Sequence, residues 1–142
     1  MPTINRKTPK KQRILSKTDR YKARRKIYNT RQWRDGLRLV QLRKQPLCQV
    51  CSLLGRTTVG ECVHHISTFA GCQTTEDMYD IAFDESNLCT LCIKHHSMLH
   101  SLDEFKKRKE KRPEDLAEYI KQNPTIEDDF GDTNEINDED DA

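Results

Sequence analysis

The sequence predicts a small α+β domain between two strongly charged ends. Its 142 residues suit one domain with tails, because a domain commonly takes about 100 to 200 residues. Only 34% of the residues are hydrophobic and 34% are charged, so the core must be small. A small core commonly needs a disulfide or a metal ion to persist. Two cysteines and three histidines fall within residues 87–100, and this density predicts a metal site.

Charge divides the chain into three parts. Residues up to 44 are strongly basic, no lysine or arginine follows Lys121, and residues 127–142 are rich in Asp and Glu. A basic arm suits a polyanion, because each phosphate that it neutralises releases condensed counterions. A solvated extension explains the same charge equally well. We expect three parts: a disordered basic arm at 1–20, a folded domain at 21–122 and a disordered acidic tail at 123–142.

The six cysteines favour metal binding over disulfides. No N-terminal stretch resembles a signal peptide, and no apolar stretch is long enough to span a membrane. We therefore expect an intracellular, cytoplasmic protein with no membrane partner. In that compartment, clustered cysteines bind metal more often than they form disulfides.

A basic helix is expected over residues 30–44. Trp33, Leu37 and Val40 fall four and three residues apart and share one face, on which the single tryptophan is expected to anchor the core. Pro46 cannot continue the helix, and the residue before a proline is biased away from helical angles.

Two short strands and a helix are expected in the centre of the chain. The β-favouring run 62–66 predicts one strand, and residues 88–91 predict another. The spacing then becomes helical, which places His96 and His100 on one helix face and His95 on another.

Two more helices are expected after the histidines. Ser101 and Glu104 fit a capping box, which predicts a helix that begins at Leu102. Pro113 suits the first position of the next helix, and Pro124 marks its end.

Cys48 and Cys51 form a Cys-x-x-Cys pair, which can hold a tetrahedral metal ion from a tight turn. One such pair is equally typical of a redox site, but redox motifs usually lie in a βαβ unit, which this sequence lacks. A second pair, Cys89 and Cys92, favours zinc.

These motifs, in this order, resemble those of the HNH endonucleases, especially small phage and bacterial members with a structural zinc. The resemblance runs from about Tyr28 to His100. It consists of the Cys48–Cys51 pair, then Val63-His64-His65-Ile66, then the segment that begins Asn87-Leu88 and ends at His96. It implies a ββα-metal core. His95 departs from the pattern, because the family usually has a second cysteine there.

The resemblance implies a structural Zn2+ site. Its ligands would be Cys48, Cys51, Cys92 and His95, and a Cys3His set is an ordinary zinc site. A rival set has Cys89 in place of His95, and spacing alone slightly favours it.

The resemblance also implies metal-dependent hydrolysis of DNA phosphodiesters. His65 would be the general base, with Asn87 holding the backbone that carries it. A catalytic Mg2+ or Mn2+ would take up charge at the phosphate. Its expected ligands are His64, His96 and His100. Neighbouring residues on a strand face opposite ways, so His64 and His65 can serve one site only at a strand end.

DNA is the partner that the resemblance implies for the basic residues. Six of them are expected to contact phosphates without reading sequence: Arg24, Arg25, Lys26, Arg31, Arg34 and Arg38. Phage relatives often act beside the terminase, which would be a further partner in the host cytoplasm, and other relatives belong to homing or restriction systems. The alternative is a non-catalytic zinc-stabilised DNA-binding module, which needs the zinc ligands but not His65.

Overall fold

The computed structural model describes residues 14–69 and 71–131 of the chain. Most of the arm predicted to be disordered, residues 1–13, lies outside the described residues, as do residues 132–142 of the predicted acidic tail.

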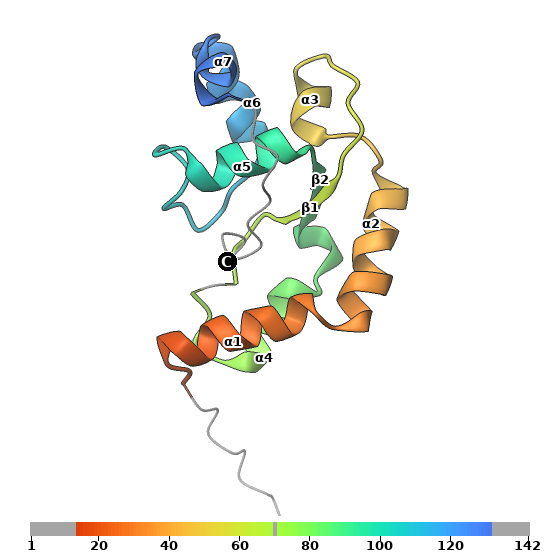
Figure 1. The fold of residues 1–142 in the computed structure, drawn as a ribbon, viewed down its shortest axis with the longest axis vertical. Coiled ribbons are helices and arrows are strands. Elements are labelled where there is room, and N and C mark those ends of the chain that lie inside the picture. Colours follow the sequence, from red (N-terminus) through yellow and green to blue (C-terminus); the bar gives the residue numbers. More distant parts are fainter. Residues whose placement is uncertain (1–13, 70, 132–142) are drawn as a thin grey trace, which may run out of the picture.

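The centre of the fold is an antiparallel pair of strands (Figure 1). These are β1 (Cys62–His65) and β2 (Leu88–Leu91), and their register pairs His64 with Cys89 and His65 with Leu88. Helices cover both sides of the pair. The predicted α+β class and both predicted strands are confirmed, with β1 one residue shorter than expected.

The basic region forms more helix than predicted. Helix α1 (Lys17–Tyr28) begins inside the arm that was predicted to be disordered up to residue 20. It starts there because the Ser16 side chain accepts a hydrogen bond from the Asp19 backbone N–H at 3.2 Å, which caps the first turn. Its Ile27 is fully buried.

The helix predicted at 30–44 is divided. A π-helical segment, η1 (Gln32–Leu37), runs into α2 (Arg38–Lys44), and the Arg38 N–H bonds to the Trp33 carbonyl five residues back. A π turn takes in one extra residue, so the residues after it are rotated by about 100° relative to a regular helix.

That rotation changes which residue of α2 faces the sheet. Val40, predicted to share a face with Trp33, is 50% exposed, so this prediction is wrong. Gln41 is buried instead, and its Nε2 donates to Thr90 Oγ1 of β2 at 3.4 Å. Trp33 is buried as predicted and packs with Val63 and Leu88.

The segment between the strands forms α4 (Thr75–Ala82) and a 3-10 turn, η2 (Glu85–Asn87). Thr74 caps α4 by accepting from the Asp77 N–H at 3.3 Å. Helix α4 packs on α1, and the contact encloses an apolar cluster made by Ile27, Phe69, Met78 and Ala82.

A second apolar cluster lies at the other end of the molecule. It is covered by α3 (Gln49–Leu53), α5 (Ile93–Ser101) and α6 (Pro113–Gln122), and α3 packs directly on α6 (Figure 1). The cluster includes Leu91, Leu99, Leu116 and Ile120.

The helix predicted to begin at Leu102 does not form. Ser101 is already the last residue of α5, so it cannot cap a new helix, and the Leu102 N–H ends α5 by bonding to the Met98 carbonyl at 2.9 Å. The chain instead turns and buries Phe105.

Part of the tail predicted to be disordered is folded. Helix α7 (Ile126–Phe130) follows α6, and its two apolar residues are half-buried against the second cluster. Two apolar side chains one turn apart were too weak a pattern to predict a helix among so many acids.

Within the described residues, no helix has both the length and the apolar character required to cross a membrane.

We expect Leu116→Ala to lower the free energy of unfolding by about 2 to 5 kcal/mol, because it leaves a cavity under α6. Glu118 lies on the exposed face of the same helix, so Glu118→Ala should change the free energy of unfolding by no more than about 0.5 kcal/mol. Chemical denaturation followed by circular dichroism measures both, and equal effects would contradict the packing described for α6.

Candidate functional site

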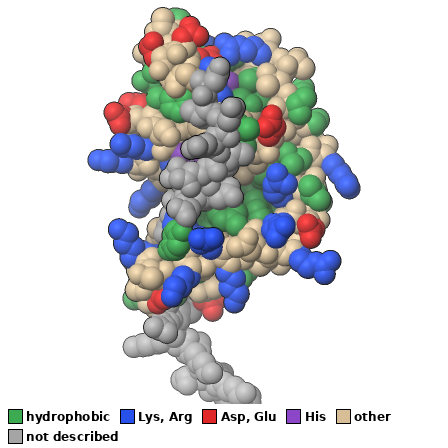
Figure 2. Space-filling view, viewed as in Figure 1, with side chains coloured by type: hydrophobic (Ala, Val, Ile, Leu, Met, Phe, Trp, Pro, Cys, Tyr) green, Lys and Arg blue, Asp and Glu red, His purple; other side chains and the backbone are tan. Residues whose placement is uncertain are grey.

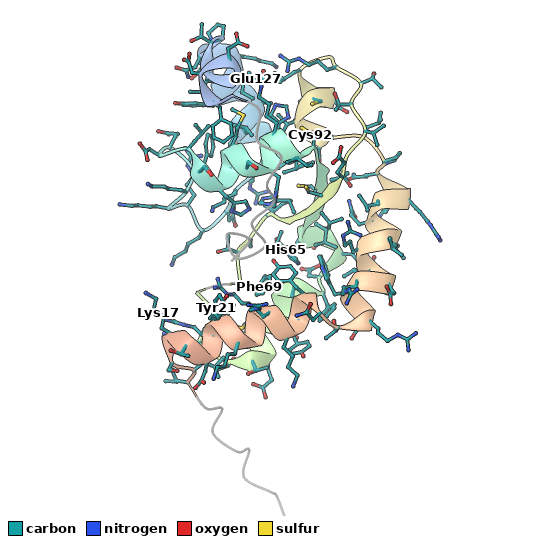
Figure 3. The ribbon with its side chains drawn as sticks, in the orientation of Figure 1. Lys17, Tyr21, His65, Phe69, Cys92 and Glu127 are labelled. Atoms are coloured by element: carbon teal, nitrogen blue, oxygen red, sulfur yellow. The ribbon has the colours of Figure 1, made fainter. Side chains whose placement is uncertain are left out.

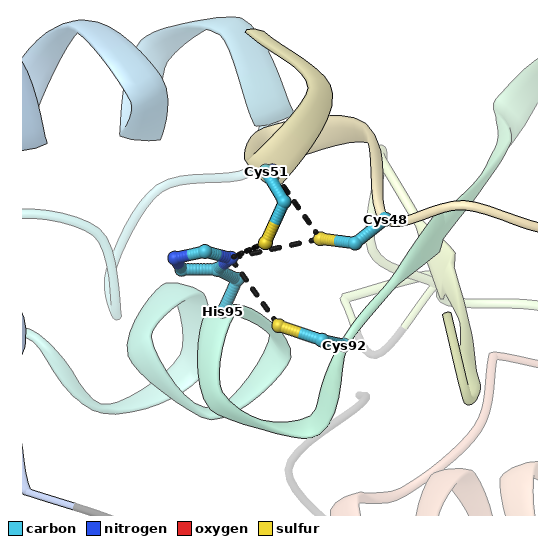
Figure 4. A group of neighbouring side chains, drawn as sticks. All are labelled: Cys48, Cys51, Cys92 and His95. Atoms are coloured by element: carbon cyan, nitrogen blue, oxygen red, sulfur yellow. Dashed lines mark hydrogen bonds between the residues drawn. The ribbon is translucent and has the colours of Figure 1, made fainter. Parts of the chain in front are cut away.

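Four side chains from two distant segments meet between α3 and α5 (Figure 4). Cys48 and Cys92 are the N-cap residues of α3 and α5, and Cys51 and His95 lie in the turns that follow. His95 Nδ1 is 3.6 Å from Cys48 Sγ, 3.4 Å from Cys51 Sγ and 3.3 Å from Cys92 Sγ. Ligand atoms of a tetrahedral metal site with bonds of about 2.0 to 2.3 Å lie about 3.6 Å apart, so the cluster fits a metal ion.

Cys89 is not part of this cluster. It lies inside β2 opposite His64 and is buried, whereas Cys92 lies past the strand where the chain turns into α5. The four residues brought together are therefore those of the set with His95, and the rival set with Cys89 is not assembled among the described residues.

The thiols of this cluster differ in acidity. A hydrogen bond from Cys92 lowers the pKa of Cys48 to about 3, and the same bond raises the pKa of Cys92. Burial raises the pKa of Cys51. Three thiolates this close together, two of them buried, repel each other and lose hydration, so a cation is required for all of them to ionise. This donor set fits a metal that prefers thiolate and imidazole ligands.

An ion pair from elsewhere in the chain contacts this cluster. His95 Nε2 is 3.1 Å from Glu127 Oε2 of α7, and Arg56 donates to both Glu127 oxygens at 2.8 and 2.9 Å. Arg56 is the main reason why the pKa of Glu127 is lowered, and His95 adds to the effect. Sequence reasoning missed Arg56 and Glu127, because neither has a motif spacing to the cysteines.

Three histidines form a second cluster between β1 and α5. The ligand atoms of His64, His96 and His100 lie within 4.8 Å of one another. His64 Nε2 is 2.8 Å from the Lys111 carbonyl oxygen. Because a carbonyl only accepts, the proton of His64 lies on Nε2, and Nδ1 is the nitrogen with a lone pair for a metal ion.

Lys111 also contacts the histidine cluster through its side chain, a contact that no motif in the sequence predicts. Its Nζ is 3.1 Å from His100 Nδ1, and the side chain is nearly fully buried. When an ammonium group donates to Nδ1, the proton of a neutral His100 lies on Nε2. His100 is therefore less well prepared than His64 to bind a metal ion.

His65 faces the other way from His64, as alternation along a strand requires. It is the last residue of β1, and its Nε2 is 3.0 Å from the Ala82 carbonyl, which places the proton on Nε2 and the lone pair on Nδ1. Its ring stacks on Trp33 at 4.7 Å and meets Phe69 edge-on at 5.0 Å. In Figure 3, His65 and Phe69 lie on the side of the sheet that faces α1.

Asn87 ties together the segments that hold His65. Its Oδ1 accepts from the Ser67 N–H at 2.7 Å, and its Nδ2 donates to the Ser67 carbonyl at 3.0 Å and to the Ile81 carbonyl at 3.3 Å. Ser67 follows His65 by two residues, and Ile81 precedes Ala82. Asn87 therefore fixes both the backbone after His65 and the carbonyl that His65 contacts.

A cavity of about 560 Å³ lies between η1, α2 and β1. Arg34, Arg38 and His96 are among the residues that line it, so two of the predicted DNA contacts adjoin the histidine cluster. The remaining four do not line this cavity: Arg24, Arg25, Lys26 and Arg31. Figure 2 shows Lys and Arg side chains over α1 and α2 and acidic side chains at the end formed by α7.

We expect His95→Ala to lose metal bound during purification, because it removes one of four ligands, whereas Cys89→Ala should keep it. Metal content per chain is measured by atomic emission spectroscopy. Metal loss in Cys89→Ala with retention in His95→Ala would contradict the ligand set described above.

No protein-family model and no curated protein matches the sequence. Among solved structures, the fold is similar to the crystal structure of the HNH endonuclease of the deep-sea thermophilic bacteriophage GVE2 with manganese ion. The TM-score is 0.54 at 27% identity, and the match covers 65% of this chain and 94% of the phage chain. The protein therefore has an HNH-type fold, with a two-stranded sheet, the helix that follows it and a Cys/His cluster able to hold a metal ion.

Proposed function

We propose that this protein is a metal-dependent HNH endonuclease that hydrolyses DNA phosphodiester bonds. The observation that carries the proposal is the His64–His96–His100 cluster, whose His64 directly precedes His65 at the end of β1 in an HNH-type fold. The neighbour of known structure is an HNH endonuclease that holds manganese, which supports the same chemistry here.

In the proposed mechanism the chain holds one proton acceptor and one divalent ion. Mg2+ or Mn2+, bound by His64 and His96 with His100 as a third ligand, would supply a Lewis acid for the scissile phosphate and the leaving 3′ oxygen. His65 takes the proton of the attacking water at Nδ1, because the Ala82 carbonyl keeps its Nε2 protonated. Asn87 would hold the backbone around His65 through its hydrogen bonds to Ser67 and Ile81.

We also propose that Cys48, Cys51, Cys92 and His95 hold a structural Zn2+. Thiolate and imidazole are the usual ligands of structural zinc, and their separations fit a tetrahedral ion. Zinc here would fold the ends of α3 and α5 together, since metal binding contributes folding energy in small domains.

DNA binding is assigned to the basic helices. Arg34 and Arg38 are the best placed of the predicted contacts, because they line the cavity shared with His96. The contacts from α1 would extend along the DNA backbone without reading sequence. A terminase partner stays a prediction.

A second candidate function is a zinc-stabilised DNA-binding module without catalysis. One observation favours it: His65 is only 1% exposed and packs among aromatic rings, whereas a base must reach water. The cleavage experiment below separates the two functions.

We expect His65→Gln to lower single-turnover cleavage of plasmid DNA about 10²- to 10⁴-fold in Mg2+ or Mn2+, the usual contribution of a general base. Glutamine keeps an N–H that can donate to the Ala82 carbonyl, so the variant should fold. Circular dichroism and zinc content serve as its controls. Undiminished cleavage in a folded His65→Gln protein, or no cleavage by the natural protein in any divalent metal, would contradict the nuclease proposal.

Loss of cleavage should be larger for His96→Ala than for His100→Ala. His100 is already engaged by Lys111, so it contributes less to metal binding. The measurement is the concentration of Mn2+ that gives half-maximal cleavage, and an equal shift in both variants would contradict the ranking of the ligands.

The double variant Arg34→Gln, Arg38→Gln should bind DNA more weakly. The slope of log K against log salt concentration should become shallower by about one unit for each phosphate contact removed. Fluorescence anisotropy over a range of NaCl concentrations gives the slope of log K against log salt. Lys121→Gln on α6 is the matched control for loss of charge, and an unchanged slope in the double variant would contradict this assignment.

A further inference from the structure

Glu127 differs from its acidic neighbours in α7. Its side chain is only 13% exposed, whereas Asp128 and Asp129 are exposed on the same short helix. Figure 3 places Glu127 at the same end of the molecule as Cys92, far from His65. A carboxylate taken out of water requires compensating partners.

Glu127 has two such partners, one on each side. Arg56 contacts both carboxylate oxygens in a bidentate pair, which keeps Glu127 ionised. His95 Nε2 lies 3.1 Å from Oε2, on the side toward the Cys/His cluster. An ionised carboxylate only accepts hydrogen bonds, so the His95 proton lies on Nε2 and the lone pair lies on Nδ1.

That tautomer is the one that a metal ligand requires here. His95 Nδ1 is the nitrogen within 3.3 to 3.6 Å of the three sulfur atoms. Carboxylates that accept from the far nitrogen of a metal-binding histidine fix the orientation of the ring and raise the basicity of the near nitrogen.

Arg56 connects this carboxylate to the opposite half of the site. The Arg56 N–H donates to the Cys51 carbonyl at 2.8 Å, so Arg56 belongs to the turn that carries Cys48 and Cys51. Glu127 therefore spans from that turn to His95 on α5. The Arg56 guanidinium balances the negative charge that Glu127 brings to the site, so the ion pair can lie beside the thiolates without adding net charge.

We propose that Glu127 is a positioning residue of the Cys48–Cys51–Cys92–His95 site, which holds the His95 tautomer through Nε2 and so tightens zinc binding. The inference rests on the structural zinc in the proposed function. It makes α7 part of the metal centre.

The first experiment compares zinc affinity among full-length variants by competition with a chromophoric chelator. We expect Glu127→Ala to bind zinc about 10- to 100-fold more weakly than the natural protein, the usual cost of losing such a partner. Glu127→Gln keeps an acceptor oxygen and should lose less. Asp128→Asn, an exposed acid of the same helix, is the control and should not change the affinity. Natural affinity in Glu127→Ala would overturn the proposal.

The second experiment separates this role from simple docking of α7 through Arg56. His95→Cys gives a four-cysteine site with no Nε2 for Glu127 to contact. In that background we expect Glu127→Ala to change zinc affinity less than threefold. A loss as large as that in the natural background would show that Glu127 acts through Arg56 alone and would overturn the positioning role.

Failure of the nuclease proposal gives a different result from failure of this one. A protein that shows the expected affinities and cuts no DNA overturns the nuclease proposal and leaves the role of Glu127 supported. A natural protein that does not bind zinc overturns both the structural zinc and this inference.

Discussion

The junction between the start of α3 and the start of α5 is the constraint on which the rest of the structure depends. Helix α3 has five residues and α5 has nine, and isolated helices shorter than about 12 residues are marginal in water. In the described part of the chain the sheet between them has two strands, and an isolated pair of strands is also marginal in water. The Cys48–Cys51–Cys92–His95 cluster joins these weak elements at one point, so a metal ion bound there would replace much of the core that the sequence lacks.

Side chains alternate in direction along β1, so His64 and His65 lie in different surroundings. His64 faces α5, where His96 and His100 extend its cluster, whereas His65 faces the aromatic side chains of the α1 side. Each ring has its Nε2 bound to a backbone carbonyl, that of Lys111 for His64 and that of Ala82 for His65. The same tautomer is thus imposed twice, and in both rings Nδ1 is left as the basic nitrogen.

Motif spacing predicted the parts of this arrangement that short segments determine. The strands, the start of α5 and the division of its histidines between two faces follow from local patterns in residues 62–66 and 87–100. Spacing could not choose between Cys89 and His95, because that choice depends on where β2 ends. Spacing also could not predict the exposure of Val40, because that exposure results from a π turn. The contacts of Lys111 and Glu127 were equally out of reach, because tertiary packing alone brings their segments to the two clusters.

The order of residues in α5 couples the two clusters. His95 and His96 are adjacent, so the helix that presents one to the cysteines presents the other to His64, with about 100° between them. Any rotation of α5 that loosened the Cys/His cluster would also turn His96 away from His64. Glu127 opposes such a rotation of α5, because it holds the His95 ring at Nε2. The Glu127 carboxylate thereby helps to maintain the geometry of the His64–His96–His100 cluster, although it contacts His95 and not that cluster.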